Sequence, residues 1–187
     1  TMGGLVEAGI GDETEFNGAL RYGGRLGERG AGRAYFKRRD YDASKSALSG
    51  RDAYDEWHME QAGFRTDWAA GDRDSFTLQG DVYHGNQQAL VRSEFTLGTL
   101  PVENVRDEIS ISGYNVLANW QRPLENGSDL RLQLYWDHTD RDIPGTFSES
   151  RDTVDIDWVH KLPLLGPHDL TWGAGIRVTT DDVEGTQ

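Results

Sequence analysis

Apolar and polar residues alternate with a period of two along much of this chain. In the stretch SFTLQGDVYHG, residues 75–85, Phe76, Leu78 and Val82 fall on one side of an extended chain, with mostly polar residues between them. Such alternation predicts a β-strand whose two faces meet different environments. Either one face packs on a protein core and the other meets water, or one face meets lipid and the other a wet lumen.

The same alternation, or a β-rich composition, recurs in nine stretches, and almost nothing in the chain indicates a helix. We predict strands over residues 3–11, 15–26, 32–41, 57–70, 75–85, 109–122, 129–141, 151–162 and 168–180. Strands in soluble domains typically have about five or six residues. These are longer, and a tilted strand needs about 9–11 residues to span a bilayer. Length therefore favours an all-β, antiparallel, up-and-down meander that forms part of an outer-membrane barrel wall.

The connections between the predicted strands alternate in length. Short segments rich in turn-forming residues follow the second, fourth, sixth and eighth strands: GERGA, GDRD, PLENGS and PLLGP. The connection after the first strand, near Asp12, is also short. Long connections follow the third, fifth and seventh strands, over residues 42–56, 86–108 and 142–150. Tight turns at one end and long loops at the other are typical of outer-membrane barrels. We therefore expect all four tight turns at one end of the sheet.

The alternation also predicts which residues share a face. On the first face, facing lipid if the sheet is a barrel wall, we expect Phe76, Leu78, Val82, Leu130, Leu132, Leu134, Val154, Ile156, Leu170, Trp172 and Ile176. On the opposite face we expect Arg65, Asp67, Gln79, Asp81, Arg131, Gln133, Asp155, Asp157 and Arg177. Trp57 and Trp136 near the long connections, with Trp68, Trp120 and Trp172 near the tight turns, suggest two aromatic girdles. Core tryptophans of a soluble β-domain are the alternative interpretation.

Composition narrows the function classes. The 187 residues carry a net charge of −13, which argues against nucleic-acid binding. Cysteine is absent, which excludes disulfides, zinc-thiolate sites and cysteine nucleophiles. No apolar run is long enough for a membrane-spanning helix, so any span must consist of strands. The opening residues lack the features of a signal peptide, so an exported protein would need a longer precursor.

Candidate chemistry is sparse. The five histidines, at positions 58, 84, 138, 160 and 168, show no metal-ligand spacing. The carboxylates of residues 137–142 lack the remaining features of a calcium loop. Asp155 and Asp157 share a face that would be polar in any barrel, so they do not by themselves indicate acid–base catalysis. We expect no enzyme activity, no bound metal and no cofactor.

Three segments resemble TonB-dependent outer-membrane receptors. GALRYGGRLGERGAGRAYFKRRD (18–40) is similar to the first barrel hairpin of that family, and GFRTDWAAGDRDSFTLQGDVYHG (63–85) is similar to the next periplasmic hairpin. YWDHTDRD (135–142), followed by SRDTVDIDWVHKLPLLGPHDLTWGAGIRVTTDD (150–182), resembles the following barrel segment. The resemblance covers residues 3–183 in the order found in the family.

This resemblance implies a 22-stranded barrel filled by an N-terminal plug. It also implies a bacterial outer-membrane location and uptake of a scarce nutrient: an iron chelate, cobalamin or an oligosaccharide. The implied partners are membrane lipid, the nutrient and the TonB complex, the last reached through a plug. Residues 1–187 correspond to the N-terminal part of the barrel, without plug or TonB box. The candidate ligand-stacking aromatics in or beside the long connections are Tyr41, Tyr54, Phe95 and Phe147. A soluble β-sandwich carbohydrate-binding module is the alternative.

Overall fold

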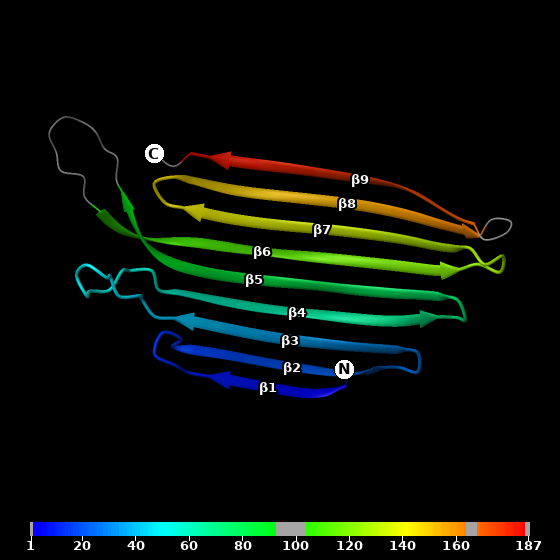
Figure 1. Cartoon of the computed structure of the whole chain (residues 1–187), viewed down its shortest axis with the longest axis horizontal. Coiled ribbons are helices and arrows are strands. Elements are labelled where there is room, and N and C mark those ends of the chain that lie inside the picture. The colour runs from blue at the N-terminus through cyan, green and yellow to red at the C-terminus, as the bar shows by residue number, and fades with distance from the viewer. Residues whose placement is uncertain (1, 93–103, 164–167, 186–187) are drawn as a thin grey trace.

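The chain folds into one antiparallel sheet of nine strands in strict sequence order (Figure 1). The structure is a computed structural model and describes residues 2–92, 104–163 and 168–185. The strands are β1 (Gly3–Gly9), β2 (Phe16–Leu26), β3 (Gly30–Tyr41), β4 (Trp57–Ala70), β5 (Asp74–Arg92), β6 (Asn104–Pro123), β7 (Asp129–Ile143), β8 (Phe147–Pro163) and β9 (Asp169–Glu184). The predicted all-β meander is thus confirmed. The sheet is not closed, because β1 and β9 each have a single neighbour.

The described residues form no second layer. A β-sandwich requires two packed sheets, and here a single sheet contains all nine strands. Among the described residues no hydrophobic side chain is buried, so there is no core of the soluble kind. The sandwich architecture is therefore wrong for this part of the chain. The described residues also contain no helix that is long and apolar enough to cross a membrane.

The predicted tight turns all lie at one end of the sheet. The β2–β3, β4–β5 and β6–β7 turns each contain a glycine with positive φ: Gly27 (67°), Gly71 (72°) and Gly127 (79°). Glycine adopts this backbone region without steric cost. β8 ends at Pro163 and β9 begins at Asp169 at this same end (Figure 1). Of the predicted segment PLLGP, residues 164–167 fall outside the described residues.

Two predicted long connections are wrong. The seventh strand runs on to Ile143 and the eighth begins at Phe147, so the predicted loop over residues 142–150 is reduced to a tight turn of residues 144–146. The Thr146 amide donates to the Ile143 carbonyl at 3.0 Å, and Gly145 has a φ of 70°. The dipeptide Pro144–Gly145 is itself a strong turn signal.

The second error concerns residues 86–108. β5 continues to Arg92 and β6 begins at Asn104, so residues 86–92 and 104–108 pair as strand; residues 93–103 lie outside the described residues. The pairing persists although apolar alternation has faded, because Asn86 and Gln88 donate to the Glu108 carboxylate, at 2.9 and 3.1 Å. Polar cross-strand contacts thus extend this hairpin beyond the rest of the sheet (Figure 1).

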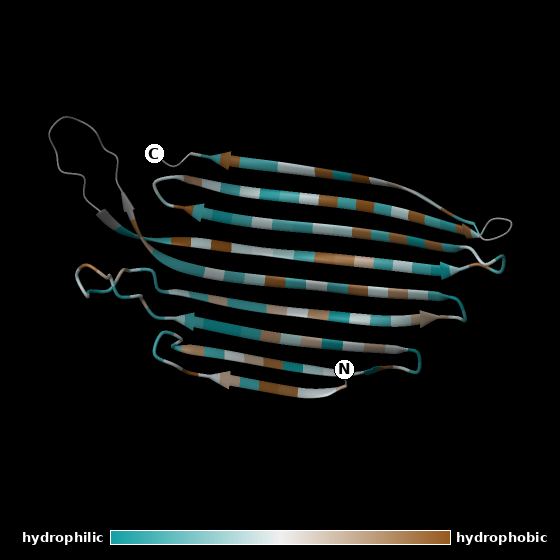
Figure 2. Cartoon of the chain, in the orientation of Figure 1, coloured by the Kyte–Doolittle hydropathy of each residue, from teal (hydrophilic) through white to brown (hydrophobic). Residues whose placement is uncertain are grey.

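The two predicted faces are confirmed by the register. Residues directly opposite each other in an antiparallel pair lie on the same face. Phe76, for example, pairs with Trp120, Trp120 with Leu132 and Leu132 with Trp158, and the predicted apolar set falls on this one face without exception. The predicted polar set falls on the other. We call these the apolar face and the polar face. Figure 2 shows the resulting alternation of brown and teal along the strands.

Aromatic rings lie at both ends of the apolar face. Trp158 and Trp172 pack edge to face near the tight turns, with centroids 4.6 Å apart, and Tyr114 packs in the same manner against Trp136, at 5.1 Å. Trp68 and Trp120 lie on this face as predicted. Trp57 does not. It pairs with Tyr41 and Gln87 on the polar face. Trp57 and Trp68 lie an odd number of positions apart along β4, so their side chains point to opposite faces of the sheet.

Glycines on the polar face make room for aromatic rings of the neighbouring strand. A Cβ placed on Gly113 would lie 2.5 Å from the His138 carbonyl oxygen and 2.6 Å from the Tyr83 hydroxyl. Because the carbonyl belongs to the backbone of β7, it has little freedom to move away. Tyr83 in turn lies 3.3 Å from the Thr139 hydroxyl, so its ring bridges three strands.

We therefore expect Gly113→Ala to destabilise the sheet by about 1–3 kcal/mol, the usual cost of overpacking. Gly24→Ala is the matched control, since its added Cβ would meet only the Tyr22 ring, at an ordinary 3.7 Å. Thermal unfolding in detergent, followed by circular dichroism, measures both. An equal melting temperature for the two variants would contradict the close packing at Gly113.

Candidate functional site

The three sequence-predicted aromatics that lie among the described residues do not form one cluster. Tyr41 ends β3, and Phe147 begins β8, five strands further across the sheet, in the tight turn opposite Ile143. Tyr54 lies in the 42–56 connection, and Phe95 lies outside the described residues. The structure therefore brings only Tyr41 and Tyr54 to the same hairpin, at the end of the sheet that carries the long connections.

Tyr41 stacks on Trp57, with ring centroids 4.4 Å apart and planes inclined by 15°. The two residues flank the 42–56 connection and pair directly across β3 and β4. Sequence reasoning assigned Trp57 to a lipid-facing girdle and so missed this pair. The signal was present, however: residues that bracket a hairpin loop at equal distance from its centre face each other. The stacked rings form a flat platform on the polar face.

Tyr54 has an unusual backbone. Its φ of 58° is the only positive value of a non-glycine residue among those described, and such strain needs support from the surroundings. The Arg106 guanidinium of β6 lies 3.6 Å from the centroid of the Tyr54 ring. This cation–π contact ties the connection to the extended β5–β6 hairpin.

The 42–56 connection is internally ordered by polar contacts. The backbone N–H and the hydroxyl of Ser44 both donate to the Asp55 carboxylate at 2.7 Å. Lys45 forms an ion pair with Asp52, and the Ala53 amide donates to the Ser44 carbonyl at 2.8 Å. The two hydrogen bonds from Ser44 lower the pKa of Asp55 below its usual range. The connection is therefore a small folded unit whose order depends on an ionised Asp55.

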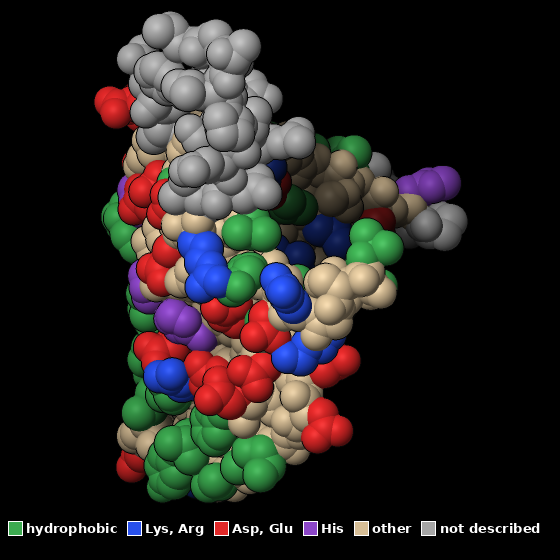
Figure 3. Space-filling model, turned by 90° about the vertical axis from the view of Figure 1, so that its left-hand side faces the viewer, with side chains coloured by type: hydrophobic (Ala, Val, Ile, Leu, Met, Phe, Trp, Pro, Cys, Tyr) green, Lys and Arg blue, Asp and Glu red, His purple; other side chains and the backbone are tan. Residues whose placement is uncertain are grey.

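An acidic pocket of about 250 Å³ opens at this end of the sheet. Figure 3 shows red Asp and Glu side chains gathered over the strand ends here. Glu56 Oε2 and Asn86 Oδ1 are buried there without a hydrogen-bond donor. Because both atoms are acceptors, the pocket fits a ligand that offers donors. The lining residues are Glu15, Asp40, Tyr41, Asp42, Glu56, Trp57, His58, Asn86, Gln88 and Glu108.

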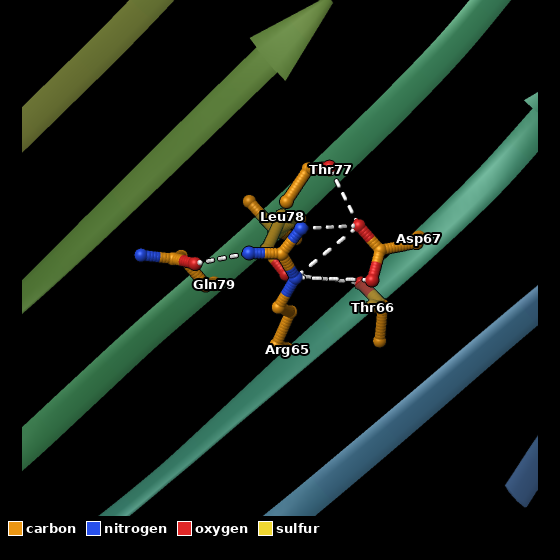
Figure 4. Close-up of polar contacts among 6 residues, drawn as sticks. All are labelled: Arg65, Thr66, Asp67, Thr77, Leu78 and Gln79. Carbon is orange, nitrogen blue, oxygen red and sulfur yellow. Dashed lines mark hydrogen bonds and ion pairs between the residues drawn. The ribbon is translucent and has the colours of Figure 1, made fainter. Parts of the chain in front are cut away.

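A second polar cluster lies on the polar face of β4 and β5 (Figure 4). The Arg65 guanidinium lies between two acceptors: it donates to the Asp67 carboxylate at 2.9 Å and to the Gln79 side-chain oxygen at 3.3 Å. The Thr77 hydroxyl also donates to Asp67, at 2.7 Å. The Arg65 guanidinium and the Thr77 hydroxyl thus both donate to acceptors within the cluster. The arrangement serves to fix the polar face and leaves no group poised for chemistry.

One of the crowded carboxylates of residues 137–142, that of Asp140, contacts His138, together with Asp152 of β8. His138 lies between Asp140, at 3.0 Å from its Nε2, and Asp152, at 3.1 Å from its Nδ1. Its ring also stacks on Tyr114, at a centroid distance of 4.9 Å. Within the described ranges no three His, Asp or Glu side chains are placed to hold a metal ion. Asp155 forms an ion pair with Arg177, at 2.9 Å between Oδ2 and Nε.

Comparison of the chain with known protein families, curated proteins and solved structures finds no match. The fold and the geometry described above therefore carry the functional argument.

The Asp55 contacts predict a pH-dependent connection. Because the folded-state pKa of Asp55 is lowered, its contribution to the order of the connection is present above the ordinary carboxyl pKa of about 4. It is lost as the pH falls through the lower folded-state value. We expect the protection factor of the Ser44 amide against hydrogen exchange to be constant at higher pH and to fall in acid. In Asp55→Asn this acid transition should be absent; an unchanged transition would assign it to another group.

Proposed function

We propose that this chain forms part of the wall of a bacterial outer-membrane transporter of the TonB-dependent receptor type. Such a transporter takes up a scarce nutrient, an iron chelate, cobalamin or an oligosaccharide, with energy supplied by the TonB complex. The observation that carries the proposal is the apolar face. It is continuous across the sheet, bounded by aromatic rings, and covered by nothing among the described residues.

The exposure of this face supports a lipid environment. Ile176 is 61% exposed and Val82 is 53% exposed, at the middle of their strands. Soluble monomers rarely leave such a large contiguous apolar surface in water. Lipid removes the cost, because hydrocarbon contacts replace water at every one of these positions.

The dimensions agree with a bilayer. On β9 the apolar face runs from Leu170 to Val178. This is about 27 Å along a strand at 3.4 Å per residue, or about 21 Å along the bilayer normal at a strand tilt of about 40°. The lipid-facing band of an outer-membrane barrel is about 25 Å tall. At the long-connection end of the same face, charged residues such as Asp182 and Glu184 follow, as expected where headgroups and water begin.

The polar face would then line the lumen. Its tyrosines, arginines and carboxylates are joined by cross-strand contacts, for example Arg177 with Asp155. The Tyr41–Trp57 platform lies on this face at the long-connection end, where an entering ligand first arrives. Tyr41 and Tyr54 remain candidate ligand contacts, whereas the tight turn at Phe147 offers little room for a binding loop. The open edges at β1 and β9 would pair with further strands of the wall.

Two neighbouring positions on β7 test this proposal. Leu132 lies on the apolar face opposite Trp120 and Trp158; Gln133 lies on the polar face opposite Asn119 and Asp157. The cost of an arginine in contact with lipid depends on depth, from about 0–1 kcal/mol near the interfaces to roughly 2–4 kcal/mol at the bilayer midplane. We expect Leu132→Arg to reduce the amount of protein assembled in the outer membrane severalfold and Gln133→Arg to assemble normally.

Membrane fractionation with heat-modifiable gel mobility measures the folded amount of each variant. The two substitutions introduce the same side chain at adjacent residues, so general effects of charge cancel. Equal assembly of both variants, or recovery of the unmodified protein in the soluble fraction, would overturn the proposal.

A further inference from the structure

Basic side chains are concentrated on the polar face of β2 and β3. Arg33, Lys37 and Arg39 occupy alternate positions of β3, with Tyr35 between the first two. Arg21 of β2 lies directly opposite Tyr35, and therefore diagonal to both Arg33 and Lys37. We call Arg21, Arg33, Lys37 and Arg39 the basic track. It runs along the middle part of β3, from Arg33 to Arg39, in a protein whose net charge is −13.

None of the four basic side chains of the track forms an ion pair with a carboxylate of the described residues. The ion pairs found in this part of the chain involve other arginines and lysines. The contrast with neighbouring residues is clear. Arg38, on the opposite face of the same strand, pairs with Asp40 and Glu60, both at 2.8 Å, and Arg65 pairs with Asp67 at 2.9 Å. The lack of carboxylate partners is therefore particular to the track and is not shared by these neighbouring arginines.

Arg21 adds an independent observation. Its Nε is buried and has no hydrogen-bond acceptor. A buried donor without an acceptor is unfavourable, and an arginine also repels cations placed diagonally to it. Both costs would be removed by an anion that accepts from Arg21 and lies between the cations.

The surroundings define the size of that anion. Acidic residues flank the track on both sides: Glu7 on β1, opposite Ala19, and Asp81 on β5, opposite Gly63. Asp81 accepts a hydrogen bond from the Tyr35 hydroxyl, and Lys37 Nζ lies 4.9 Å from the Tyr35 ring centroid. The positive strip is therefore about two strands wide, at about 4.8 Å between strands, and about 20 Å long. A broad acidic protein surface would meet Glu7 and Asp81 as well, whereas a small anion would not.

We propose that the basic track binds a small multivalent anion that carries carboxylate or phosphate groups. Arginine guanidinium groups bind both kinds of oxyanion through paired hydrogen bonds. The inference rests on the proposed function in one respect: only in a barrel wall does this face line the path of the transported compound. It then specifies an anionic nutrient, which enters past the Tyr41–Trp57 platform and meets Arg39 first.

The test uses the complete protein purified in detergent, with citrate as the tricarboxylate probe and pyrophosphate as the phosphate probe. Isothermal titration calorimetry at low and at physiological salt measures the dissociation constants. We expect at least one probe to bind, with weaker affinity at higher salt. Lys37→Gln combined with Arg39→Gln should weaken binding at least tenfold. Which probe binds identifies the oxyanion class.

Arg131→Gln combined with Arg141→Gln is the matched control, because both arginines lie on the polar face of β7, away from the track. This control should bind as the unmodified protein does. Arg33→Gln serves as a second track variant if the double variant fails to fold, as judged by gel mobility, and should also weaken binding.

Three outcomes would overturn the inference. These are no binding of either probe, equal losses in track and control variants, or binding of a glutamate-rich peptide alone, which would assign the surface to a protein partner. The measurement needs neither a membrane nor transport. A protein that assembles in the outer membrane but binds neither probe refutes this inference alone, whereas equal assembly of the Leu132 and Gln133 variants refutes the proposed function.

Discussion

Backbone pairing between adjacent strands holds this structure together. No hydrophobic side chain among the described residues is buried, so the usual burial term of a soluble domain is missing. In its place, eight consecutive antiparallel pairings join the nine strands, with register maintained to the last residues of most of them. Backbone amides and carbonyls cost free energy wherever they lack a partner away from water. A long, regular meander satisfies them between neighbours without any second layer.

Register in turn determines what each face can do. Because paired residues share a face, a single slip of one residue would exchange the apolar and polar sets of a whole strand. Close contacts at glycines help to prevent this. The Tyr83 ring lies over Gly113, and the Tyr35 ring over Gly63, so each aromatic residue marks a position where the neighbouring strand must present no side chain. Cross-strand pairs such as Arg177 with Asp155 add charge complementarity to the same register.

The two ends of the sheet differ in a way that suits a directional protein. At one end glycine turns close the hairpins at minimal length. Polar and aromatic groups are concentrated at the other end. They belong to the internally hydrogen-bonded 42–56 connection, to Tyr54 with its Arg106 contact, and to the acidic pocket. The basic track begins near this second end, on the face opposite the apolar one. The proposed ligand entry, polar path and lipid-facing wall would each use a different part of this one sheet.

The sequence by itself determined the class of fold, the number of strands and the composition of both faces. It did so because strand periodicity is local: whether Leu132 and Gln133 lie on opposite faces depends only on their adjacency. Glycine turns at positions such as Gly71 are local for the same reason. The tertiary structure decided the rest. It extended β5 and β6 through polar contacts with Glu108 and stacked the Trp57 ring on Tyr41 across β3 and β4. It also brought Arg21 beside Arg33 and Lys37. These features depend on which residue of a neighbouring strand lies opposite, and that information is absent from any single stretch of sequence.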